Sequence, residues 1–105
     1  MTAAQAAAFD QRCLDSSMAL WPGSVRIGTT SYRASVVVGS GEAVVNAGGI
    51  QAQEALTVEI SRDLLDEAPT IGHMIEDVAT GKSYEIDRVL AEASRWLIRA
   101  AIFPN

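Results

Sequence analysis

Cysteine and histidine are nearly missing from this sequence of 105 residues, and their scarcity excludes two classes of small protein. Cys13 is the one cysteine, so it has no partner for a disulfide within the chain. His73 is the one histidine, whereas a structural zinc site usually needs about four nitrogen or sulfur donors. Folds held together by disulfides or zinc are therefore excluded, and we expect neither a metal ion nor a cofactor.

Positive charge and long apolar runs are also scarce. The chain has eight basic and thirteen acidic residues, which gives a net charge of −5. A negatively charged protein is repelled by a phosphate backbone, so we expect no sequence-specific binding of nucleic acid. No stretch approaches the ~20 apolar residues of a membrane span. The first residues, MTAAQAAAFDQR, lack the basic segment and apolar run of a signal peptide. We expect a cytoplasmic protein that does not enter membranes.

The composition that remains is that of a folded domain. Hydrophobic residues make up 49% and charged residues 20% of the chain, which is far from the composition of a disordered protein. A chain of this length has room for one hydrophobic core. We therefore expect a single domain over residues 1–105.

An alanine-rich segment predicts a helix at residues 2–21. Thr2 is a suitable N-cap, no glycine or proline interrupts the segment, and Trp21-Pro22-Gly23 ends it. One broad apolar stripe is expected to face the rest of the protein: Phe9, Cys13, Leu14, Met18, Leu20 and Trp21. The side expected to face solvent carries Asp10, Gln11 and Asp15.

After Gly23 the apolar residues alternate with polar ones, which is typical of strands. Strands are predicted at residues 24–28, 31–38, 55–60, 73–78, 83–89 and 94–102. The inward phase of the later strands predicts one buried cluster made of Leu56, Val58, Tyr84, Ile86, Trp96 and Ile98. One helix followed by about six strands with short turns favours a mainly β fold, a small antiparallel β-barrel or sandwich over residues 24–102.

Residues 39–54 interrupt this pattern. Glycines on both sides of a short Ala43-Val44-Val45 run predict a long, mobile loop with at most one weak strand. Because loops of this length are usually functional, we assign binding of a protein partner to this segment. The residues proposed to make the contacts are Gly39, Gly41, Val44, Val45, Gly48, Gly49 and Ile50.

The sequence offers little support for catalysis. Residues 79–83, ATGKS, match the second half of a phosphate-binding loop, but Glu76 stands where the first glycine belongs and a strand pattern follows Lys82. A hairpin turn is the simpler interpretation. Cys13 is expected to pack inside, and the acidic residues of segment 63–77 lack the spacing of a calcium loop. We assign no catalytic residue and expect the protein not to be an enzyme.

The order of motifs in the second half of the chain resembles a known family. Pro69-Thr70-Ile71-Gly72-His73-Met74-Ile75 is followed by Thr80-Gly81-Lys82-Ser83-Tyr84-Glu85-Ile86, then by Val89 and Trp96-Leu97-Ile98. This run is similar to the P-x-x-G-x-x-I, G-K-x-Y-x-V and W-x-L motifs of small neck proteins of tailed bacteriophages. Lambda-type head–tail joining proteins also begin with an N-terminal arm or helix that contains a Phe-Asp pair, as Phe9-Asp10 does here.

The resemblance implies a small β-barrel with a structural role in the virion. Several copies would form a ring between the head connector and the tail, after the subunits gather in the host cytoplasm either as monomers or already assembled. Partners would be further copies of the chain together with connector and tail proteins. A tail-terminator or tail-tube-like barrel is the alternative, and a small ligand-binding or enzymatic barrel is a third hypothesis.

Overall fold

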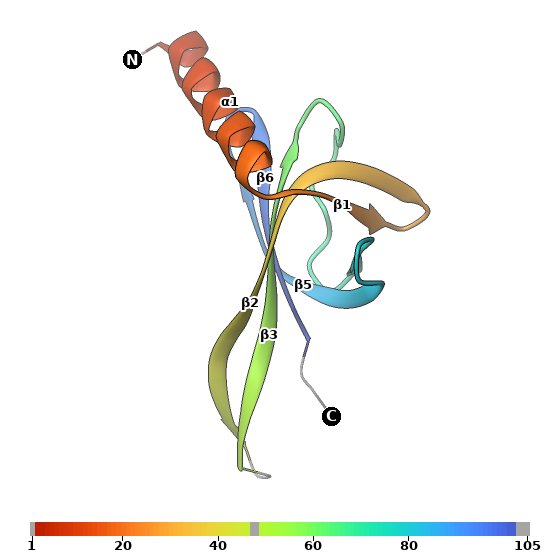
Figure 1. Ribbon diagram of the computed structural model, residues 1–105. Coiled ribbons are helices and arrows are strands. Elements are labelled where there is room, and N and C mark those ends of the chain that lie inside the picture. The colour runs from red at the N-terminus through yellow and green to blue at the C-terminus, as the bar shows by residue number, and fades with distance from the viewer. Residues whose placement is uncertain (1, 47–48, 103–105) are drawn as a thin grey trace.

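The computed structural model describes residues 2–46 and 49–102, and within these ranges the side chains outside residues 40–53. The elements are α1 (Ala3–Leu20), β1 (Pro22–Ile27), β2 (Thr30–Asn46), β3 (Gly49–Ser61), β4 (Met74–Asp77), β5 (Lys82–Ala91) and β6 (Arg95–Ile102). The strands close into a barrel in the order β1-β2-β3-β6-β5-β4, with antiparallel neighbours throughout. The predicted mainly β fold with one N-terminal helix is confirmed as a barrel (Figure 1).

The helix α1 begins where the sequence predicts. Thr2 and Gln5 form a capping box, in which the backbone N–H of each residue donates to the side chain of the other, at 2.8 and 3.1 Å. At the other end the Trp21 N–H donates to the Ser17 carbonyl before Pro22 starts β1. Within the described residues no helix has the length and apolar character needed to cross a membrane.

The core fills the interior of the barrel with side chains from all six strands. Its buried members are Val25, Ala34, Leu56, Val58, Ile60, Ile75, Tyr84, Ile86, Trp96, Ile98 and Ala100. The predicted buried cluster of six residues is contained in this set, so the assigned strand phases are confirmed. A barrel packed in this way is rigid, because every inward side chain is held by its neighbours.

The predicted orientation of α1 is confirmed for Leu14, which is buried, and for Asp15, which is exposed, but it is wrong for Asp10 and for three of the apolar residues. The buried residues of the helix are Asp10 and Leu14, whereas Phe9 and Trp21 are about half exposed and Leu20 is 73% exposed. The interpretation assumed that the most apolar side faces inward. The barrel places Ser94 and Arg95 beside Asp10, and their hydrogen bonds offset the cost of burying its carboxylate.

The prediction of a loop at residues 39–54 is also wrong. Strands β2 and β3 continue through this segment as paired strands, from Gly39 opposite Ala55 to Asn46 opposite Gly49, with a register shift between Ser40 and Ala43. Pairing between β2 and β3 satisfies the backbone groups on one side of each strand, and this offsets the weak strand preference of glycine. We call residues 39–54 the hairpin arm.

The hairpin arm and α1 project from the barrel at opposite ends of the molecule (Figure 1). The molecule consequently measures 50 Å along its longest axis, against 30 and 25 Å along the others. The barrel is the rigid part from which two extensions emerge.

Candidate functional site

The hairpin arm is a two-stranded ribbon whose edges carry no further strand among the described residues. Pairing of β1 with β2 ends at Pro22 opposite Ser35, and the Val36 N–H still donates to the Trp21 carbonyl at 2.9 Å. On the other side, pairing of β3 with β6 ends at Glu54 opposite Ile102. Beyond these points the strands pair with one another alone, so peptide groups along both edges face outward.

Five of the seven residues proposed to bind a partner are paired in this ladder. Gly39 pairs with Ala55, Val44 with Gln51, Val45 with Ile50, and Gly49 with Asn46, while Gly41 lies at the register shift and Gly48 lies outside the described residues. The structure therefore places them on one projecting element. Their contact with a partner stays a prediction.

The base of the arm is attached to the barrel by the carboxylate of Glu54. The hydroxyl of the buried Tyr84 donates to one carboxylate oxygen at 3.1 Å, and the Lys82 ammonium lies 3.4 Å from both oxygens. Burial, the hydrogen bond to Glu54 and nearby negative charges raise the pKa of Tyr84 to about 12. Tyr84 therefore remains a neutral donor at any physiological pH.

The turn before Lys82 is a hairpin turn, as predicted. The Asp77 carboxylate accepts from the Ala79 N–H and the Thr80 hydroxyl, each at 3.2 Å. Gly81 adopts a φ of 74°, which suits glycine, and its N–H donates to the Asp77 carbonyl at 2.8 Å. Because β5 follows directly, the helix N-terminus required by a phosphate-binding loop does not occur at Lys82.

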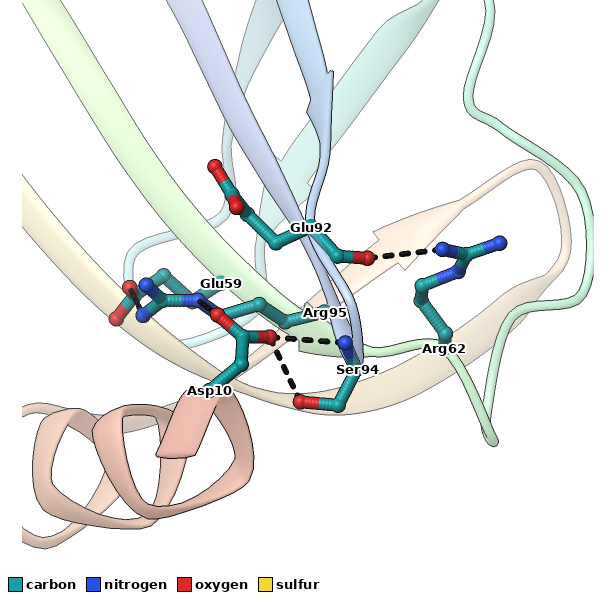
Figure 2. A network of polar contacts seen from close by, with 6 residues as sticks. All are labelled: Asp10, Glu59, Arg62, Glu92, Ser94 and Arg95. Atoms are coloured by element: carbon teal, nitrogen blue, oxygen red, sulfur yellow. Dashed lines mark hydrogen bonds and ion pairs between the residues drawn. The ribbon is translucent and has the colours of Figure 1, made fainter. Parts of the chain in front are cut away.

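At the other end of the barrel, four side chains fasten α1 to the strands, and we call Asp10, Glu59, Ser94 and Arg95 the helix clamp (Figure 2). The Asp10 carboxylate accepts from the N–H and the hydroxyl of Ser94, at 2.8 and 2.7 Å, and from Arg95 Nε at 2.9 Å. The Arg95 guanidinium also binds Glu59. Burial raises the pKa of Asp10, but the bonds from Ser94 and the charge of Arg95 lower it further than burial raises it.

A second set of contacts holds the segment after β3 against the same end of the barrel. Arg62 donates to the Glu92 carbonyl at 2.8 Å (Figure 2), and its guanidinium lies 4.7 Å from the centre of the Trp96 ring. The indole N–H of Trp96 donates to the Leu65 carbonyl at 2.7 Å. These contacts and the helix clamp were not predicted, because they join residues far apart in the sequence.

The outward side of α1 leaves apolar surface uncovered. A shallow hollow beside Phe9 is lined by Arg12, Cys13 and Ser16. Cys13 is partly exposed there, so its expected place in the core is wrong. Among the residues whose side chains the structure describes, no three His, Cys, Asp or Glu side chains lie close enough together to hold a metal ion.

A hollow on the barrel surface lies between β1 and the turn before β4. The His73 side chain lines it, together with Arg26 and Glu76, which form an ion pair. The guanidinium is thus already neutralised by a carboxylate. This leaves the hollow without a strong preference for an anionic ligand.

Comparisons with family models, with curated proteins and with solved structures each gave no match. The function must therefore be argued from the arrangement of this chain's own residues.

Proposed function

We propose that this chain is a structural subunit of a tailed bacteriophage or prophage, which forms a ring and joins the head connector to the tail. The observation that carries the proposal is the hairpin arm, which extends from a closed barrel with two unpaired edges. Barrel closure removes strand edges, and the arm restores them at one defined place. Such edges suit an element that is covered by a partner in an assembly.

The two projections at opposite ends of the barrel support this proposal (Figure 1). A subunit between two larger structures needs contacts in two directions, and a rigid barrel keeps these contacts at a fixed separation. The order of sequence motifs that resembles phage neck proteins supports the same role. The net charge of −5 keeps free subunits soluble and gives little attraction for DNA in a channel.

Removal of the gene from the phage that carries it, followed by electron microscopy of the lysate, tests the proposal. We expect filled heads and complete tails that remain separate, and infectious particles should form when purified protein is added to the lysate. Tails of irregular length would instead indicate a tail terminator or tail-tube protein. A normal yield of infectious phage would refute a role in the virion.

A shortened chain tests the hairpin arm itself. Gly39 lies opposite Ala55, so an Asn-Gly pair that replaces residues 41–53 closes the ribbon with a four-residue loop, Ser40-Asn-Gly-Glu54. Loop-closure entropy changes slowly with length, so we expect stability within about 1 kcal/mol of the full chain. The shortened protein should no longer join heads to tails. Full joining activity would refute the assignment of the arm.

A further inference from the structure

We propose that the unpaired edge of β2, residues 37–46, binds the outer edge of β3, residues 49–53, of a second copy of this chain. The hairpin arms of successive subunits then form one continuous antiparallel sheet around the ring. The inference rests on the proposed function in that it requires a ring, and it adds which edges meet and which copy supplies the partner.

The direction of the peptide groups in β2 shows which backbone N–H and carbonyl groups are free to bind the strand of a second copy. The Val36 N–H points toward β1, where it donates to the Trp21 carbonyl. Peptide groups alternate in direction along a strand, so the Val38 N–H and carbonyl point to the same side as those of Val36. Since β1 pairing has ended there, the Val38 groups face outward with no strand beside them among the described residues. The Val37 groups point toward β3.

The sequence of the arm lacks the usual protection of an exposed edge. Lysine, proline and inward charges commonly prevent strands from pairing with other chains. Residues 37–53 contain neither lysine nor proline, and Glu42 is the single charged residue in this stretch of an acidic chain. The register shift between Ser40 and Ala43 is the one disruption of the ladder. Two copies that repel one another elsewhere thus meet here with little charge repulsion.

Among the described residues, each arm has one free edge on β2 and another on β3. This favours a contact between β2 of one copy and β3 of the next over a contact between two β2 strands. Strands β2 and β3 run antiparallel, so rotation about an axis along the arms places β3 of one copy antiparallel to β2 of the next. This contact repeats around a ring and covers both edges of every arm. A two-fold contact between β2 strands would stop at a dimer and leave each β3 edge bare.

The substitution Val38→Pro tests the edge directly. Proline removes an N–H that faces outward, and its ring occupies the space of an incoming strand, while the β2–β3 ladder keeps its hydrogen bonds. The matched control is Val38→Thr, which keeps the N–H and the branched side chain of an exposed position. Native mass spectrometry and sedimentation at up to about 1 mM, where even weak association is populated, give the number of copies.

We expect rings of more than two copies for the full chain and for Val38→Thr, and association at least about tenfold weaker for Val38→Pro. The Val38 amide should exchange its hydrogen rapidly in the monomer and slowly in the ring, with the Val37 amide protected in both. A full chain that stays monomeric, a dimer alone, or unchanged association of folded Val38→Pro overturns the inference. If Val38→Pro does not fold, the chain with residues 41–53 replaced by Asn-Gly takes its place and should be monomeric; rings from that chain overturn the inference.

An assay of head–tail joining, combined with the association measurements, distinguishes failure of this inference from failure of the proposed function. A Val38→Pro protein that associates as strongly as the full chain and still joins heads to tails overturns the edge contact and leaves the function standing. A full chain that forms rings through this edge and yet restores no infectious particles overturns the function and leaves the edge contact standing.

Discussion

Removal of the Asp10 carboxylate should detach α1 from the barrel, and Asp10→Ala makes this change without weakening the helix itself, because alanine has a higher helix propensity than aspartate. Asp10 is 7% exposed and accepts three hydrogen bonds. Hydrogen bonds to a charged group contribute about 1.5–3 kcal/mol each, but they are not independent. Arg95 keeps Glu59 after the substitution, which limits the cost of leaving its charge unpaired. We expect a loss of about 3 kcal/mol in the free energy of unfolding, which for a domain of this size lowers Tm by about 15 °C.

Urea unfolding followed by far-UV circular dichroism and by tryptophan fluorescence measures the loss. Asp15→Ala is the matched control, because Asp15 lies on the same helix, is exposed and bonds to Gln11 within the helix. It should cost less than about 0.5 kcal/mol. Equal stability of the two variants would show that the clamp does not hold the helix.

The loss of stability caused by Asp10→Ala should depend on pH. The folded-state pKa of Asp10 lies below its usual value of 3.8, so the charged form is favoured by folding. Its contribution is therefore complete above about pH 4 and is lost as the pH falls through the folded-state pKa. The difference in stability between the full chain and Asp10→Ala should narrow below pH 3.8. A constant difference down to pH 2 would contradict the assigned charge.

Trp96→Ala should lose about 3–5 kcal/mol and yield little soluble protein, since the indole is nearly buried and hydrogen-bonded; an unchanged Tm would contradict this. The pKa of Tyr84 is raised from the ordinary tyrosine value of 10.0 to about 12 in the folded protein, so its contribution to stability is complete below pH 10 and is lost as the pH rises toward 12. Tyr84→Phe should remove that part of the alkaline loss in a pH series of thermal melts. Cys13→Ser and Lys82→Ala should leave head–tail joining intact, because Cys13 lies at a shallow hollow and the Lys82–Glu54 ion pair is exposed. Loss of joining by folded Lys82→Ala would revive a role for the residues 79–83 in binding phosphate.

The barrel strands were predictable because their signal is local. Leu56, Val58 and Ile60 alternate with polar residues, and the same alternation around Tyr84 and Trp96 placed both in the core. A strand with one buried face requires an apolar residue at every second position, and this alternation is visible in the sequence.

The orientation of α1 was not predictable from the same kind of signal. Asp10 is buried because Ser94 and Arg95, 84 and 85 residues away, supply its hydrogen bonds. An acidic residue in an alanine-rich helix looks like a solvent-facing residue until such partners are placed beside it.

The hairpin arm was located but its structure was mistaken. The valines of β2 indicated one weak strand, but the partner segment of β3 has one branched residue, Ile50, among glycine, glutamine and alanine. Pairing with an adjacent strand decided its structure, and propensity alone does not measure that contribution.

Strand β3 connects the two ends of this molecule mechanically. Glu54 is held by Tyr84 at the base of the arm, and Glu59 on the same strand is held by Arg95 in the helix clamp. An extended strand advances about 3.4 Å per residue, so the backbone positions of these two residues lie roughly 17 Å apart on one strand. A slide or twist of β3 therefore moves both attachments together. We therefore expect a displacement of the arm to be passed along β3 to the contacts that hold α1.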